Sequence, residues 1–145
     1  MGYVIGTTLD REFADTLDAT RVALAAQGFG ILTEIDLSAT MRAKLGVEVP
    51  AQVILGACRP PLALAALQAE PSVGVLLPCN VVVRSLDDGR TRVEAMDPAT
   101  MVDLTGNERL ADVAGVARAL LDAALTDLAA ALSRNDPADR PEETS

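Results

Sequence analysis

A predicted β-hairpin near the middle of this 145-residue chain constrains its fold more than any other feature. Residues 74–86 are rich in β-branched and apolar side chains, and Asp87-Asp88-Gly89 after them is a typical tight-turn sequence. Two sets of side chains then alternate along residues 90–96. These two runs predict antiparallel strands, which excludes a wholly helical fold and a purely parallel doubly wound fold.

Further strands and helices are expected on both sides of this hairpin. Alternating or continuous apolar runs predict strands, and apolar residues three and four apart predict helices. The expected strands cover residues 3–9, 31–36 and 49–56, and the expected helices cover 10–28, 38–46, 62–69, 98–105 and 108–134. The chain is therefore predicted to be α+β, with a mainly antiparallel sheet of four or five strands and helices packed on one face.

Capping residues and prolines predict local details of these elements. Asp10 and Ser38 are the expected N-caps of the first two helices. Pro78 cannot donate to a strand ladder, so we expect a bulge or an edge position near Pro78 and Cys79. Residues 62–69 are almost wholly apolar, which predicts a buried helix.

Composition and charge exclude several classes of function. Only 2% of the residues are aromatic, so aliphatic side chains and alanines must fill the core. The net charge is −9, and the eleven arginines and Lys44 form no basic stripe, which argues against nucleic-acid binding. No secretory signal and no apolar run of about 20 residues is visible, so we expect a cytoplasmic protein without membrane association.

The chain contains no histidine, which limits its chemistry further. Serine–histidine and cysteine–histidine catalysis, imidazole metal sites and the usual neutral-pH proton shuttle are all excluded. Glu34 and Asp36 share one side of an expected strand, but paired carboxylates at alternate positions usually belong to a solvated face. The sequence therefore favours a protein that is not an enzyme, and it names no cofactor.

Two cysteines are the candidate functional residues. Cys58 ends a strand next to Arg59 and ahead of a helix, a position that favours the thiolate. Cys79 follows Pro78 at an expected bend, and the amide of Asn80 lies beside it. We expect the two thiols to lie at one end of the sheet, unlinked, with roughly 5–10 Å between their sulfurs.

These cysteines have two readings that the sequence leaves open. They can be packed as small apolar side chains, or they can serve a redox or ligand-binding role. Two thiols without histidine are too few for a closed zinc site, although a dimer could supply four and Cu(I) could take two. We therefore expect no metal site in the single chain.

Three stretches resemble the bacterial domain-of-unknown-function family 302, called DUF302. They are residues 27–35 with Gly28-Phe29-Gly30, residues 54–58 with Gly56-Ala57-Cys58 followed by Pro60, and residues 74–83 with Leu77-Pro78-Cys79-Asn80. The resemblance covers about residues 3–104. It implies a compact α+β sandwich, often a homodimer, with no established activity. Some relatives are associated with haem or redox settings, but a histidine ligand does not carry over, because the chain lacks histidine.

Together these features predict one domain over residues 1–134, in which residues 108–134 are an added helix, and a disordered acidic tail over residues 135–145. The favoured function is a non-catalytic cytoplasmic binding or interaction domain that acts as a homodimer, with an unidentified small-molecule ligand near Cys58, Arg59, Cys79 and Asn80. Self-association is expected through an apolar helix face or an exposed strand. The alternative is a thiol-based redox or metal-handling protein that uses the two cysteines.

Overall fold

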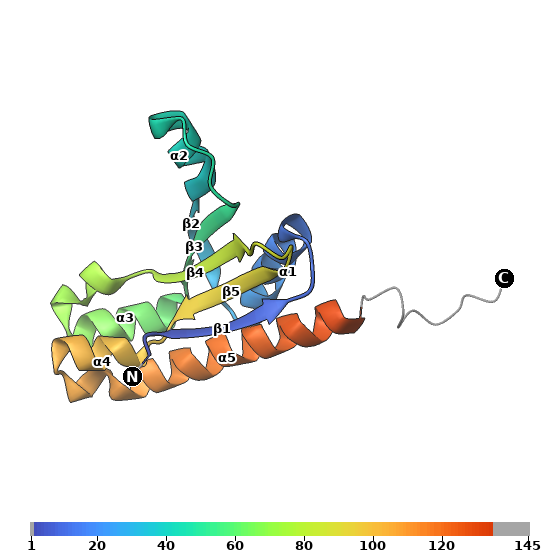
Figure 1. The fold of residues 1–145 in the computed structure, drawn as a ribbon. Coiled ribbons are helices and arrows are strands. Elements are labelled where there is room, and N and C mark those ends of the chain that lie inside the picture. The colour runs from blue at the N-terminus through green and yellow to red at the C-terminus, as the bar shows by residue number, and fades with distance from the viewer. Residues whose placement is uncertain (1, 135–145) are drawn as a thin grey trace.

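The computed structural model describes residues 2–134 and contains one five-stranded antiparallel sheet (Figure 1). The strands are β1 (Val4–Leu9), β2 (Gly30–Asp36), β3 (Gln52–Cys58), β4 (Cys79–Ser85) and β5 (Thr91–Met96). Their order across the sheet is β1-β5-β4-β3-β2, so the predicted hairpin of β4 and β5 lies near its centre. The expected disorder of the acidic tail concerns residues outside the described part of the chain.

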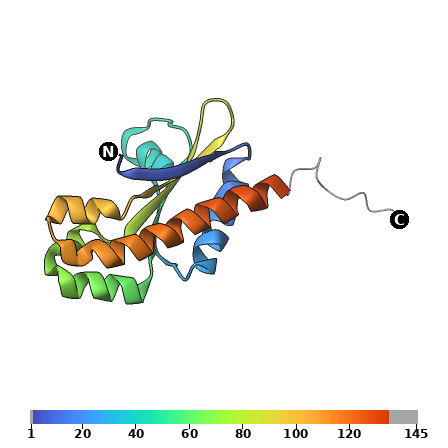
Figure 2. The same cartoon turned by 90° about the horizontal axis from the view of Figure 1, so that it is seen from below.

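Four of the five α-helices in the described residues lie on one face of this sheet or at one of its ends, and the second projects from the opposite end (Figure 1). The helices are α1 (Phe13–Ala26), α2 (Leu37–Leu45), α3 (Pro60–Ala69), α4 (Ala99–Thr105) and α5 (Ala111–Arg134), with two short 3-10 helices, η1 (Pro71–Leu76) and η2 (Glu108–Leu110). Figure 2 shows α5 running the length of the domain, with α1 beside one part of it and α3 and α4 beside the other. The predicted α+β class with helices packed on one face is confirmed.

The main core lies between the sheet and the pair of helices α1 and α5. Because side chains alternate along a strand, every second residue of the central strands faces these helices. The buried side chains from the strands are Val53, Leu55, Ala57, Val81, Val83, Val93 and Ala95, and those from the helices include Leu17, Leu24, Leu121, Ala124 and Leu128. This core is built from aliphatic side chains, as the low aromatic content requires.

A second, smaller core closes the end of the domain. Each of α3, η1, α4, η2 and α5 contributes one fully covered side chain to it, namely Ala66, Val73, Met101, Leu110 and Ala114. The apolar stripe of α5 is therefore divided between two cores, the first half serving the small core and the second half serving the sheet. Five side chains of α5 are thereby buried within the chain and are not free for self-association, namely Ala114, Ala117, Leu121, Ala124 and Leu128.

The expectation of a buried helix over residues 62–69 is wrong. In α3 only Ala66 is buried, while Leu64 and Leu67 are exposed. The helix lies at the end of the domain, so one of its sides faces the small core and the others face solvent (Figure 2). An apolar sequence therefore does not by itself place a helix in the interior.

The expected bulge near Pro78 is also absent from its predicted place. Residues 71–76 form η1, and β4 begins only at Cys79 in a regular ladder with β3. Pro78 precedes the first ladder position, so its missing N–H removes no strand hydrogen bond. The irregularity lies instead in the edge strand β2, between Ile31 and Thr33.

Helix starts are shifted from the expected residues, whereas the predicted glycine stop is correct. Glu12, and not Asp10, is the residue before α1. Asp36 caps α2 by accepting a hydrogen bond of 2.9 Å from the backbone N–H of Ala39, and the Ser38 hydroxyl donates to the same carboxylate. Gly46 ends α2 with a φ of 65°, a left-handed conformation that favours glycine.

Candidate functional site

The two cysteines lie at the same end of neighbouring strands. Cys58 is the last residue of β3 and Cys79 is the first of β4, and the antiparallel register places Ala57 opposite Cys79. Both cysteines border one small cavity, and both are free thiols. The expected shared, unlinked locality is therefore present, while the separation of roughly 5–10 Å between the sulfurs stays a prediction.

Strand alternation gives the two thiols different surroundings. Cys79 and its partner Ala57 belong to the set of side chains that faces the main core, and both are buried. Cys58 follows Ala57 and so belongs to the opposite set, where it is half-buried. The two thiols therefore do not form a facing cross-strand pair.

The cavity itself is apolar and small. Its volume is about 30 Å³, which is room for one or two water molecules. Its wall comes from β3, α3, α4 and α5 and includes Phe29, Leu62, Ala66, Leu77, Met101 and Val113. Sites for drug-sized ligands or cofactors are about ten times larger or more, so this cavity as it stands suits only the end of a ligand.

Burial decides the chemistry of the second thiol. Removal from water raises the pKa of Cys79, and the neighbouring Cys58 raises it further. A raised thiol pKa means less thiolate at neutral pH, and the thiolate is the nucleophile and metal ligand. Cys79 is therefore suited to packing, and the half-buried Cys58 is the more accessible of the two.

Arg59 lies at the rim of the cavity with a free guanidinium. The residue is half-buried and precedes α3 in extended conformation. Its side chain crosses Gly28 so closely that a Cβ there would lie 2.9 Å from Arg59 Nε. Among residues 2–134 no hydrogen bond or ion pair engages this guanidinium. A ligand or partner with an anionic group could therefore bind it.

Asn80 is not part of the cavity that the cysteines border. It lies opposite Gly56 in the register, so its side chain points to the sheet face away from the main core, where it is exposed. Of the four sequence-predicted site residues, the structure brings Cys58, Arg59 and Cys79 together and leaves Asn80 on the other face. Strand alternation separates neighbours in sequence, which explains the difference.

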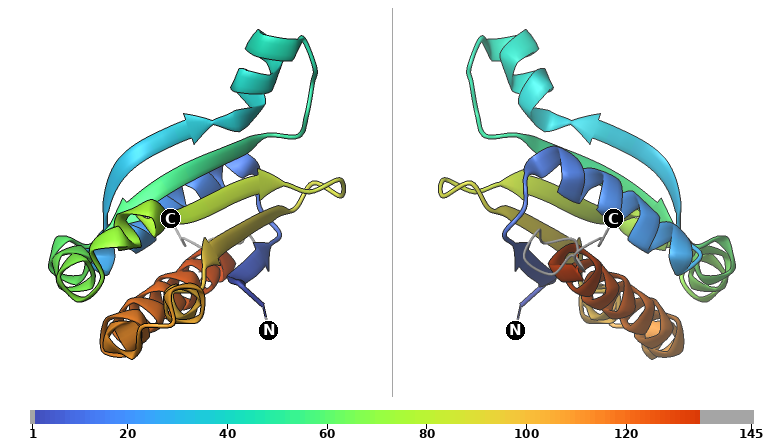
Figure 3. Two further views of the ribbon diagram at one scale, coloured as in Figure 1. Left: turned by 90° about the vertical axis from the view of Figure 1, so that its left-hand side faces the viewer. Right: turned by 90° about the vertical axis from the view of Figure 1, so that its right-hand side faces the viewer.

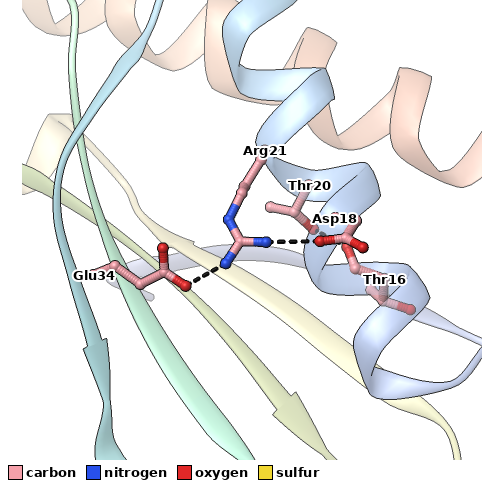
Figure 4. Close-up of polar contacts among 5 residues, drawn as sticks. All are labelled: Thr16, Asp18, Thr20, Arg21 and Glu34. Carbon is pink, nitrogen blue, oxygen red and sulfur yellow. Dashed lines mark hydrogen bonds and ion pairs between the residues drawn. The ribbon is translucent and has the colours of Figure 1, made fainter.

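The two carboxylates of β2 have structural partners. Glu34 forms an ion pair with Arg21 of α1, which also binds Asp18 at 2.7 Å (Figure 4). Asp36 caps α2, and the hydrogen bonds from Ala39 and Ser38 lower its pKa. These acids therefore link β2 to its neighbouring helices and do not form an acid–base pair.

The sheet face away from α1 and α5, called here the outer face, is a feature that sequence reasoning missed. None of the buried side chains of the main core belongs to it in the described residues. Its members include Ile35, Ile54, Val82, Arg84, Arg92 and Glu94. Arg84 binds Glu94 at 2.9 Å, and Arg92 donates to the Thr8 hydroxyl. The sequence signal that could have revealed this face is the presence of apolar residues between polar ones at alternate positions of β3 and β4.

The described residues offer neither a cluster of metal ligands nor a membrane-spanning helix. Within residues 2–134 no group of three or more histidine, cysteine or acidic side chains is placed to hold a metal ion. Over the same residues, no helix combines the length and the apolar character needed to cross a bilayer.

Comparison with known proteins gives a family and similar solved structures, one of which is described here. The model of the domain of unknown function DUF302 matches residues 5–128. The crystal structure of an uncharacterized conserved DUF302 protein from Bacillus stearothermophilus is 25% identical, covers 89% of this chain and 99% of its own, and superimposes with a TM-score of 0.81. No curated protein matches the chain.

The family match extends well beyond residue 104, where the sequence resemblance was expected to stop. It includes most of α5. This extension agrees with the packing, because α5 supplies buried side chains to both cores and neither core would be closed without it. The chain belongs to the DUF302 family.

Proposed function

We propose that this DUF302 protein is a non-catalytic binding domain that acts as a homodimer. The observation that carries the proposal is the outer face of the sheet. Its central apolar side chains, Ile54 and Val82, are only half-buried, and Ile35 at its edge is 46% exposed. Apolar side chains that stay accessible among polar ones on one side of a sheet support a surface that binds another protein.

The ligand-binding part of the proposal rests on the cavity beside Cys58. The free guanidinium of Arg59 supplies a positive charge at its rim, and the apolar wall supplies a short hydrophobic recess. A small ligand with an anionic group and an apolar end fits this combination. Burial raises the pKa of Cys79, which supports a binding role over nucleophilic catalysis by that thiol.

Light scattering coupled to size-exclusion chromatography tests the homodimer. At high micromolar concentration the expected mass is twice the 15.1 kDa of the chain. A mass of one chain across the whole concentration range would contradict the proposal. The ligand-binding part of the proposal is tested by titrating short-chain carboxylates into the wild type and into Arg59→Gln. We expect the wild type to bind them and the variant to lose this binding.

A thiol-based function is the second candidate, because both cysteines border one cavity. It requires that Cys58 and Cys79 oxidise to a disulfide and return reversibly to thiols. Thiol titration before and after treatment with oxidised glutathione measures this directly. Loss and full recovery of two thiols per monomeric chain would favour this candidate over the binding domain.

A further inference from the structure

Residues 35–51 form a projection that we call the arm. It consists of the end of β2, α2, and the segment that returns to β3. Figures 1 and 3 show that α2 stands away from the other helices and from most of the sheet. Ser38 is the only buried residue among these 17, so the arm has almost no core of its own.

The arm carries apolar side chains at the positions that are most open to solvent. Leu45 is 69% exposed and Val47 is 48% exposed, on either side of Gly46. Ile35 and Val49 add to the same projection. Each of these side chains leaves unfavourable apolar surface in water. A short projection that exposes four large apolar side chains is better explained as a binding element than as a solvated loop.

A groove joins the arm to the outer face on the same chain. It has a volume of about 280 Å³ and lies where α2 overhangs β3 and β4. Its walls are Leu37, Met41, Val49, Pro50, Gln52, Arg84 and Ser85. The chain thus presents both a projecting apolar element and an apolar groove at its base.

We propose that the arm clasps the outer face of a second copy of this chain, and that the two copies exchange arms in this way around a twofold axis. A twofold rotation that places one arm against the partner's groove also places the partner's arm against the first groove. A single interface would therefore cover the apolar side chains of the arms and of the grooves. This inference rests on the homodimer proposed above and names its contact surface.

Charge favours a second copy at this face over any other face. The chain carries a net charge of −9, so two copies repel each other over most of their surfaces. The outer face is an exception, because Arg84 and Arg92 outnumber Glu94 there. The arm itself carries no net charge, because Arg42 and Lys44 balance Asp36 and Glu48, and Arg42 is paired with Glu48. It can therefore approach this face without the repulsion that acts between the acidic parts of two chains.

The test substitutes exposed residues, so that the fold is retained. The arm variant is L45D/V47D, and the matched control is L64D/V75D, which places the same charges at exposed apolar positions of α3 and η1. Circular dichroism first checks that both variants keep the helical signal and melt cooperatively. We expect the arm variant to dimerise roughly 100-fold more weakly or not at all, and the control to dimerise like the wild type.

The outcomes separate this inference from the proposed function. A monomeric wild type refutes the homodimer and the arm contact together. A dimeric wild type with an equally dimeric arm variant refutes only the arm contact, as does a control that dissociates to the same extent. If the arm variant fails to fold, hydrogen exchange of the wild type decides: amides of residues 46–51 must become more protected as the concentration rises through the dimerisation range.

Discussion

The substitution Gly56→Ala tests how closely the outer face of the sheet is packed. Gly56 lies in the middle of β3, between Thr33 of β2 and Asn80 of β4. A Cβ on Gly56 would lie 2.1 Å from Thr33 Oγ1 and 2.8 Å from Pro78 Cγ. Non-bonded carbon atoms normally keep about 3.5–4.0 Å apart, so both neighbours must move.

The expected cost follows from how each neighbour can respond. The Thr33 hydroxyl lies on the exposed edge strand and can turn about its Cα–Cβ bond. The Pro78 ring cannot rotate away and must shift with its backbone. Overpacking of this kind costs about 1–3 kcal/mol. Alanine gains about 0.5–1 kcal/mol over glycine within a strand. Because both contacts are so short, the upper part of the overpacking range applies, about 2–3 kcal/mol, and we expect a net loss of about 1–2.5 kcal/mol in the free energy of unfolding.

Urea denaturation followed by circular dichroism measures this loss, because the chain has many helical residues and no tryptophan. All variants are compared at one protein concentration, since dimerisation adds to apparent stability. The control is Gly115→Ala in α5, where nothing lies within 4 Å of the new Cβ. There the same substitution should stabilise the protein by about 0.5–1 kcal/mol.

Two results would refute the reasoning about Gly56. The first is a Gly56→Ala variant as stable as the wild type, or stabilised like Gly115→Ala. The second is full recovery in the double variant G56A/T33A. Removing the threonine hydroxyl relieves one contact, but the Pro78 ring stays 2.8 Å from the new Cβ, so only part of the loss should return.

Two further predictions concern titratable groups. A maleimide should label Cys58 before Cys79 at about pH 8, because burial raises the pKa of Cys79 and leaves less thiolate; timed labelling with mass spectrometry measures this, and equal rates contradict it. Hydrogen bonds from Ala39 and Ser38 lower the pKa of Asp36 below 3.8. Its cap on α2 should therefore persist above about pH 4 and be lost as the pH falls through the lowered pKa. The Ala39 amide should lose exchange protection there, and an Asp36→Asn variant should show no such step.

The fold was largely predictable because its strongest signals are local. The Asp87-Asp88-Gly89 turn fixes the central hairpin, and the spacing of apolar residues along α5 identifies the longest helix. Gly46 stops α2 because a left-handed residue is required there. Each of these signals depends on nearby residues alone, so no knowledge of distant contacts was needed.

The errors arose where a distant contact decides the outcome. The apolar run in α3 predicted burial, but Ala66 is the only residue of this helix that is buried. Asn80 follows Cys79 in sequence, yet strand alternation places its side chain on the opposite face. Pro78 was expected to disturb a ladder, but the chain places it one residue before the ladder begins. Sequence spacing does not reveal which side of an element is covered.

Self-association was expected through an apolar helix face or an exposed strand, and the structure narrows these routes. The stripe of α5 is occupied by the two cores. The edge strand β1 carries no charge or bulge that would block pairing. However, Asp122 of α5 lines the space beside β1. Symmetric pairing of two β1 strands would bring together two copies of α5, each with Asp122 beside β1, and two chains of charge −9. Repulsion between the chains opposes that pairing. The arm carries no net charge, and the outer face holds Arg84 and Arg92 against Glu94, so the arm is the surface on which dimerisation should depend.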